Sequence, residues 1–278
     1  GVAIATAPES EVRAGDDGCV TEDECTWPKP NLMFVVEYST RMNEPMANQP
    51  GVTRWEATVD AIVLMMEGDN GFLGNNVNLS LLRYGHDPAP TVTDTPIVGD
   101  VSNPPLMDGL ARDLHWYVPE GPDTDYIECV GSTFLTIVQD LPPPLNGATT
   151  GIGSWTRGAL EEATALRTAS RAEHGELVGD RAYPVVLMTA GVHTPPNGVA
   201  AEFTAADDPA PIVASAWNDE GSPTYVVHVG DDDTQADADA LALAGGTLQA
   251  IPVVEPLILW DAINQFIQDI KDGVIAPE

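Results

Sequence analysis

Residues 31–42 of the chain are Asn-Leu-Met-Phe-Val-Val-Glu-Tyr-Ser-Thr-Arg-Met, and they give the clearest indication of the fold. The run from Leu32 to Val36 is apolar throughout, without polar alternation, which is typical of a strand buried on both faces of a parallel sheet. Residues 53–56, Thr-Arg-Trp-Glu, form a capping box, and apolar residues recur behind it at helical spacing. The sequence therefore predicts a buried strand followed by a helix.

Further segments continue this alternation of strands and helices. Strand-like runs occupy 77–84, 183–189 and 225–230, and helical patterns occupy 156–169, 211–218, 237–244 and 259–270. Strands that alternate with helices of this length require right-handed crossovers. We therefore predict an α/β fold with a doubly wound, mostly parallel open sheet and helices on both of its faces.

The domain organisation follows from the segments that interrupt this pattern. Residues 1–30 are acidic and turn-forming, and we expect them to be a leader; residues 31–278 are expected to form one domain. Proline-rich stretches at about 86–125 and 141–151 are too long or too irregular for ordinary connections. They are predicted to be surface insertions.

The charge of the chain excludes two classes of partner. The sequence has 11 basic and 43 acidic residues, a formal net charge of −32, which repels nucleic acid and anionic lipid. No apolar run reaches the roughly 18 residues of a membrane helix. Since the chain starts with Gly1 and not Met, we expect a mature chain freed of a secretory signal, located outside the cell, on the cell surface or in the periplasm. The acidity itself is interpreted as an adaptation to solubility or salt.

The chain has three cysteines, which fits an oxidising compartment. Cys19 and Cys25 flank a short acidic turn, whereas Cys129 stands alone in an amphipathic stretch. Two pairings remain open, namely Cys19 with Cys25, which we favour, or Cys129 with one of these two. The spacing of Cys19 and Cys25, with no histidine nearby, is not that of a zinc site.

Several segments resemble the von Willebrand factor A (vWA) domain family. Residues 31–42 are similar to its first strand and Asp-x-Ser-x-Ser-Met turn, 152–160 to its Gly-x-Thr and Ala-Leu segment, and 185–191 to its strand ending in Thr-Asp-Gly. Residues 225–230 and 243–246 are similar to the strand and helix that close that fold. The resemblance extends from about 31 to 270 in the right order, and it implies a vWA-like domain.

The resemblance also implies a site, because three loops of that family build a metal-ion-dependent adhesion site. There, Ser and Thr hydroxyls and carboxylates hold Mg²⁺, which takes a ligand carboxylate. In this chain the corresponding residues are Glu37, Ser39, Arg41, Thr156 and Ala190. Arg41 replaces a hydroxyl and Ala190 replaces a carboxylate, so that oxygen ligands are lost and a positive charge is added. We therefore expect a degenerate site that binds neither Mg²⁺ nor Ca²⁺, and no cofactor.

Two interpretations of these positions remain. In one, the site is lost and the fold is kept for packing or assembly. In the other, Arg41 takes the place of the ion and forms a bidentate ion pair with Glu37, so that the site still offers hydroxyls and a cation to a ligand. The acidic run 231–233 lacks EF-hand spacing and is interpreted as a solvated loop.

No sequence motif points to catalysis. The five histidines lie far apart without a His-Glu-x-x-His pattern, and residues 151–154, Gly-Ile-Gly-Ser, form neither a nucleophile elbow nor a phosphate loop. We therefore expect no enzymatic activity.

Two functions from different classes fit these observations. The first is a secreted or cell-surface, adhesion-type domain that binds a protein ligand. The second is a structural subunit of an extracellular assembly or filament, in which the apolar residues 1–7 dock on another copy of the chain. An intracellular vWA domain that partners an ATPase has the same fold but does not suit the cysteines.

Overall fold

The computed structural model describes residues 27–85, 110–119, 124–144, 153–196 and 198–271. Its centre is a six-stranded sheet with the order β3-β2-β1-β4-β5-β6. The strands are β1 (Asn31–Glu37), β2 (Asn78–Tyr84), β3 (Leu110–Leu114), β4 (Val185–Thr189), β5 (Thr224–His228) and β6 (Ile251–Pro252). All neighbouring strands are parallel except β2 and β3, which are antiparallel. The predicted α/β fold with a mostly parallel open sheet is confirmed.

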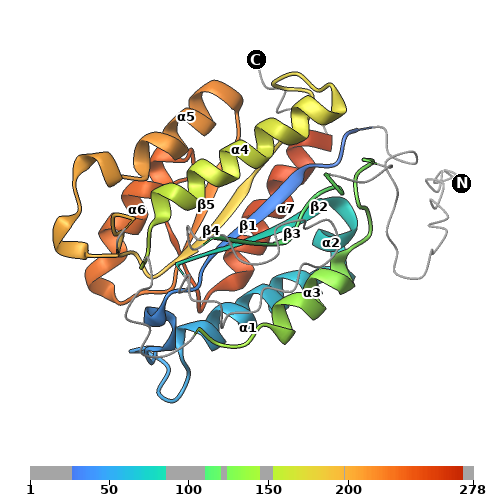
Figure 1. Ribbon diagram of the computed structural model, residues 1–278. Helices are drawn as coiled ribbons and strands as arrows, with labels where there is room; N and C mark the ends of the chain where they lie inside the picture. Colours follow the sequence, from blue (N-terminus) through green and yellow to red (C-terminus); the bar gives the residue numbers. More distant parts are fainter. Residues whose placement is uncertain (1–26, 86–109, 120–123, 145–152, 197, 272–278) are drawn as a thin grey trace, which may run out of the picture.

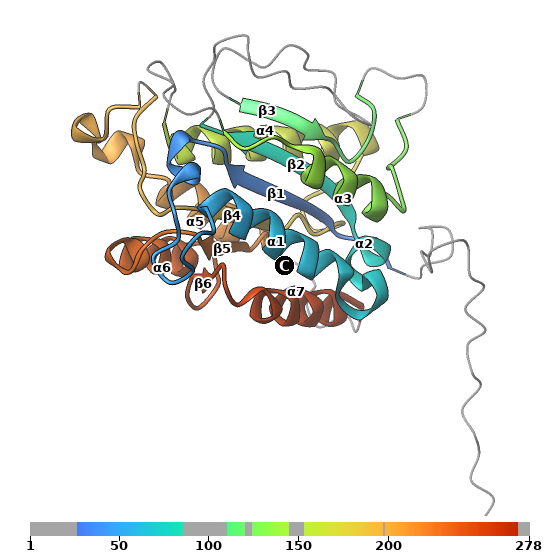
Figure 2. The ribbon, with the colours of Figure 1, turned by 90° about the horizontal axis from the view of Figure 1, so that it is seen from below.

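Helices cover both faces of this sheet (Figures 1 and 2). The α-helices are α1 (Arg54–Glu67), α2 (Phe72–Asn76), α3 (Gly131–Asp140), α4 (Thr156–His174), α5 (Ala210–Glu220), α6 (Gln235–Ala244) and α7 (Pro256–Lys271). Short 3-10 helices are η2 (Thr40–Asn43), η3 (Gly68–Gly71), η4 (Ala200–Glu202), η5 (Ala205–Asp207) and η6 (Asp232–Thr234). Helices α1, α3 and α7 lie on one face, and α4, α5 and α6 lie on the other.

Strand β1 explains why residues 32–36 carry no polar alternation. Leu32, Phe34 and Val36 belong to the core between the sheet and α1, α3 and α7. Met33 and Val35 belong to the second core, on the side of α4, α5 and α6. Since successive side chains of a strand point to opposite faces, a strand covered on both faces is apolar at every position.

The predicted capping box begins α1 as expected. The Thr53 hydroxyl accepts a hydrogen bond from the Glu56 amide at 3.1 Å, and the Glu56 carboxylate accepts one from the Thr53 amide at 2.7 Å. Both interactions satisfy amide groups that have no partner inside the helix. Helix α1 therefore starts where the sequence places it.

The predicted insertion at 86–125 contains an element that the sequence did not indicate. Its residues 110–114 form β3, which pairs antiparallel with β2 at the edge of the sheet. Arg83 of β2 and Asp113 of β3 form a buried ion pair, with Nε and Oδ2 2.5 Å apart. This part of the segment thus belongs to the sheet. Residues 86–109, the leader up to 26 and most of the second predicted insertion, 145–152, lie outside the described residues.

Cys129 is disulfide-bonded, whereas Cys19 and Cys25 lie outside the described residues. The partner of Cys129 is not among the described residues, so both predicted pairings stay predictions. The adjacent Glu128 forms an ion pair with buried Lys29, with Nζ and Oε2 3.0 Å apart. The last residues of the predicted leader are therefore held next to Cys129. Among the described helices, none is long and apolar enough to cross a membrane.

Candidate functional site

The carboxyl ends of β1 and β4 meet at one edge of the sheet, where open α/β folds place their ligands. Glu37 is the last residue of β1, and Thr189 is the last residue of β4. The two strands are direct neighbours in the sheet. The segment that leads into α4 reaches the same place. It carries Ser154, whose hydroxyl donates a hydrogen bond to Glu37. Three segments far apart in the sequence thus surround the Glu37 carboxylate.

The Glu37 carboxylate is fully buried and accepts four hydrogen bonds from these segments. Its Oε1 atom accepts from the hydroxyls of Ser39, at 2.6 Å, and Ser154. Its Oε2 atom accepts from the Thr189 hydroxyl at 3.0 Å and from the Ala190 amide at 2.8 Å. A carboxylate offers about four lone-pair positions, so each oxygen is fully used. The charge is therefore stabilised entirely by groups of the chain itself.

Thr156 lies in a second layer behind this carboxylate. Its hydroxyl is 2.9 Å from Nδ1 of His193 and 3.4 Å from the hydroxyl of Tyr84. Burial raises the pKa of Tyr84, and the negative charge of Glu37 adds to this shift. Burial also lowers the pKa of His193, although Glu37 and other carboxylates oppose the change. Both side chains are consequently neutral at neutral pH.

The ion pair between Arg41 and Glu37, one of the two interpretations left open, is not formed among the described residues. Arg41 lies in η2, is half-buried, and forms no ion pair within the described part of the chain. The physical reason is that neutral donors already occupy both oxygens of Glu37, so no acceptor position faces a guanidinium. At the next predicted position the Ala190 side chain belongs to the apolar core, and only its backbone amide reaches the site.

The structure thus brings four of the five predicted site residues together and leaves Arg41 apart. Glu37, Ser39 and Ala190 are in direct contact, and Thr156 is one layer away. Sequence reasoning missed Ser154, although it lies within residues 152–160, a segment that resembles the vWA family. Its position two residues before Thr156 could have indicated a site residue, because both hydroxyls then lie at the start of α4.

No group of three or more His, Cys, Asp or Glu side chains in the described segments could hold a metal ion. The acidic run after β5 is partly neutralised by protein groups as well. Arg54 Nη2 lies 2.8 Å from Asp231 Oδ2, and Arg54 Nη1 lies 2.6 Å from Glu44 Oε2. This buried arginine thereby joins the loop after β5 to the loop that follows η2.

No protein-family model and no curated protein sequence matches the chain. Among solved structures, the pilus adhesin SpaC from Lactobacillus rhamnosus GG matches 88% of this chain and 31% of its own, with a TM-score of 0.50 and 13% identity. The vWF domain of the type V pili tip protein Mfa5 from Porphyromonas gingivalis matches 90% of this chain and 98% of its own, with a TM-score of 0.48 and 12% identity. Proximal thread matrix protein 1 from the mussel byssus matches 88% of this chain and 48% of its own, with a TM-score of 0.47 and 12% identity.

The chain therefore spans about a third of the length of the adhesin and about half of the length of the mussel protein. At 13% identity the likeness to SpaC concerns the fold alone. The chain shares its α/β fold with that adhesin.

Proposed function

We propose that this chain is a non-catalytic, adhesion-type domain that binds proteins outside the cell or at its surface without a metal ion. The observation that carries the proposal is the buried Glu37 carboxylate with its four internal donors. In the vWA family, which the sequence resembles, a divalent ion connects the corresponding loops. In this chain Glu37 makes those connections itself, so the loops are held in place without an ion.

The direction of the hydrogen bonds supports a metal-free site. A hard cation binds the lone pairs of oxygen atoms. Its binding is favoured by carboxylates whose oxygens are not already engaged in hydrogen bonds. The hydroxyls of Ser39, Ser154 and Thr189 instead direct their hydrogens at Glu37. An ion would have to break these hydrogen bonds, and Ala190 offers it no side-chain ligand, because only its backbone amide reaches the site.

The same burial argues against catalysis at this place. His193 and Thr156 lie within hydrogen-bond distance, as a general base and a nucleophile would. However, the Thr156 side chain is fully buried, so a substrate has no access to its hydroxyl. The shared fold with SpaC, which is a pilus adhesin, fits a binding role of the surrounding loops.

A second candidate, a subunit of an extracellular assembly, is favoured by an apolar surface around β6. Leu248 is 92% exposed, Ile258 49% and Trp217 39%, and all three line an open pocket of about 570 Å³. Contiguous apolar patches on a soluble domain commonly mark contacts with other proteins. Residues 1–7, the other part of this hypothesis, lie outside the described residues.

Light scattering coupled to size-exclusion chromatography distinguishes the two candidates. For a binding module we expect a monomer of about 29.4 kDa over a wide range of concentrations. An assembly subunit would instead give higher masses that rise with concentration. Polymers that persist at low micromolar concentration would contradict the binding-module proposal.

A variant that lacks residues 1–7 sharpens this measurement. If those residues connect copies of the chain, their deletion abolishes the higher masses while the circular dichroism spectrum stays unchanged, because no described strand or helix is removed. If the binding-module proposal is right, the deletion leaves both the mass per chain and the spectrum essentially as they were.

A further inference from the structure

The surface of the described residues carries acidic groups with very few cations among them. Six of the eleven basic residues are buried, namely Lys29, Arg54, Arg83, Arg167, Arg171 and Arg181. Three more are half-buried, namely Arg41, Arg112 and Arg157. The fold thus uses its cations inside, in ion pairs such as Arg83 with Asp113 and Arg167 with Glu220. A partner that meets this surface therefore encounters more carboxylates than cations.

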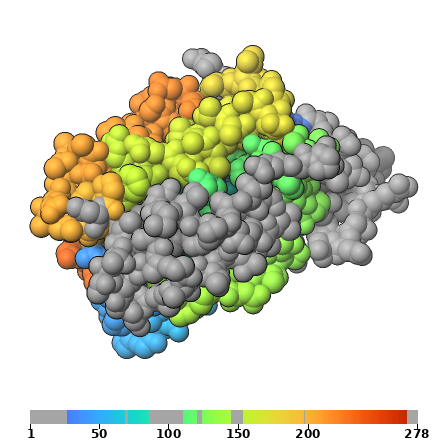
Figure 3. All heavy atoms as spheres, in the orientation of Figure 1, coloured from blue at the N-terminus to red at the C-terminus, as the bar shows by residue number. Residues whose placement is uncertain are grey.

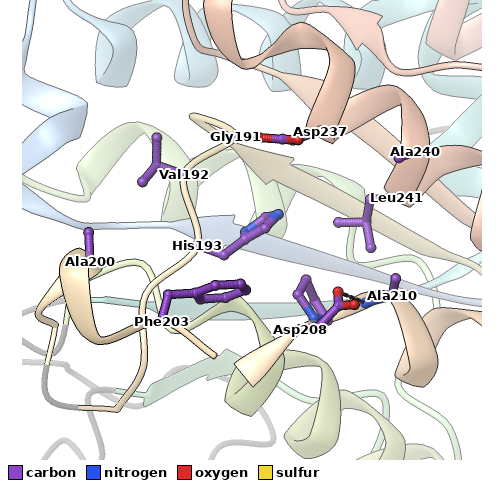
Figure 4. A pocket seen from close by; sticks show the side chains of 11 residues that line it. Gly191, Val192, His193, Ala200, Phe203, Asp208, Ala210, Asp237, Ala240 and Leu241 are labelled. Carbon is purple, nitrogen blue, oxygen red and sulfur yellow. Dashed lines mark hydrogen bonds between the residues drawn. The ribbon is translucent and has the colours of Figure 1, made fainter. Parts of the chain in front are cut away.

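One pocket combines this charge with apolar walls. It has a volume of about 460 Å³ and lies between the segment after β4, the residues before α5, and α6 (Figure 4). In the space-filling view the segment after β4, coloured amber, stands at the left margin of the molecule, where a partner can reach it (Figure 3). The pocket is next to the Glu37 site, because His193 lines it and also contacts Thr156.

The charged groups of this pocket are two carboxylates. Figure 4 shows His193 between Asp237, above it in the view, and Asp208, below it. Neither carboxylate forms an ion pair within the described part of the chain. One oxygen of Asp208 accepts a hydrogen bond from the Ala210 amide at 2.9 Å, which fixes that side chain at the start of α5. His193 adds no charge at neutral pH, because burial lowers its pKa.

The nearest guanidinium has other partners. Arg157 Nη1 donates to the backbone carbonyl of Asp208 at 3.1 Å, and its Nε donates to Glu161 at 2.8 Å. The Asp208 carboxylate can therefore still accept hydrogen bonds from a group in the pocket. The remaining walls are apolar and include Val192, Phe203 and Leu241.

These walls determine which kind of cation the pocket suits. His193, Asp208 and Asp237 do not form a group that could hold a metal ion, as no such group occurs in the described segments. A small hydrated ion would also gain nothing from the apolar walls. A lysine or arginine side chain matches both features of the pocket. Its aliphatic stem packs on the apolar walls, and its charged end reaches the carboxylates.

We propose that this pocket binds a lysine or arginine side chain of the partner protein, with the stem against Phe203 and Leu241 and the charged end at the carboxylates that line the pocket, Asp208 and Asp237. The proposal rests on the proposed binding function, and it specifies the chemistry of the partner. Binding at this pocket requires no change in the Glu37 network, because Asp208 and Asp237 take no part in it.

Nuclear magnetic resonance titration of the full chain tests the pocket with defined probes. The probes are the N-acetyl methylamides of lysine and arginine, and the norleucine derivative serves as the neutral control of similar shape. We expect saturable shifts of the amides of Gly191, His193 and Asp237 with the two cationic probes. In a variant with Asp208→Asn and Asp237→Asn, affinity should fall by about fivefold, in line with two charge contacts that solvent partly screens, since Asp208 is half-buried and Asp237 is exposed.

A variant with Asp219→Asn is the control for the loss of a carboxylate outside the pocket. Asp219 lies on α5 but does not line the pocket, so this variant should bind the cationic probes as the unmodified chain does. Shifts spread evenly over the acidic surface, or equal binding by the doubly substituted variant, would overturn the proposal. So would norleucine shifts at the same residues with equal affinity. The proposed function is tested separately, by the mass of the chain in solution and by its independence of metal ions, so this proposal can fail while the proposed function stands.

Discussion

Glu37→Ala is expected to lower the free energy of unfolding by about 3–5 kcal/mol, because four buried donors lose their common acceptor. The substitution leaves the hydroxyls of Ser39, Ser154 and Thr189 and the Ala190 amide without their acceptor, in a place that water does not reach. Each buried donor without a partner costs about 1–3 kcal/mol, and partial rearrangement of the hydroxyls keeps the sum below the upper limit. Urea denaturation at neutral pH measures the loss.

Two further variants control this experiment. Glu37→Gln preserves the shape but turns an amide group toward two of the donors, and we expect an intermediate loss. Glu173→Ala removes an exposed carboxylate of α4, and its effect should stay within about 0.5 kcal/mol. A loss below about 1 kcal/mol for Glu37→Ala would show that the three loops do not depend on this carboxylate.

The ion pair between Arg83 and Asp113 should have an effect of similar size. Its two side chains are 1% and 2% exposed, and Nη2 of Arg83 lies 2.6 Å from Oδ1 of Asp113 in addition to the contact through Nε. Asp113→Ala removes the carboxylate and leaves the guanidinium charge in the core, so we expect a loss of about 3–5 kcal/mol in urea denaturation. Because this pair connects β2 to β3, the edge strand should be the first part to lose protection in hydrogen exchange.

A double substitution separates the charge from the packing. When Arg83→Met and Asp113→Leu are combined, no charge is left behind, and most of the stability should return. Glu161→Ala, which breaks the exposed pair of Arg157 and Glu161 on α4, should cost less than about 0.5 kcal/mol. Equal losses for the buried and the exposed pair would contradict the expected difference between buried and exposed ion pairs.

The sheet could be predicted from the sequence where strands are buried on both faces. The apolar run before Glu37 follows from the burial of a strand on both faces. The helical spacing after Thr53 follows from the burial of a helix on one face. Strand β3 could not be predicted in this way. Its centre holds Arg112 and Asp113, and it pairs with β2 through an ion pair that only the fold brings together.

In the site, too, residues within local motifs could be predicted, whereas contacts between distant residues could not. Resemblance to vWA domains identified Glu37, Ser39, Thr156 and Ala190, because these residues lie at the ends of predicted strands or at the start of a helix. It did not indicate that Glu37 would be the acceptor for all nearby donors. That role depends on Ser154, whose hydroxyl reaches Glu37 across 117 positions of sequence.

We propose that Glu37, and not a metal ion, connects the loops at the carboxyl edge of the sheet. Isothermal titration calorimetry with millimolar Mg²⁺ or Mn²⁺ tests it most directly, and Ser39→Ala is the control for any signal. A variant with Glu37→Asp, Arg41→Ser and Ala190→Asp, which restores the ligand pattern of the vWA family, serves as the comparison. We predict no saturable heat for the unmodified chain and a saturable heat for the restored variant. A saturable site in the unmodified chain that Ser39→Ala abolishes would contradict the claim.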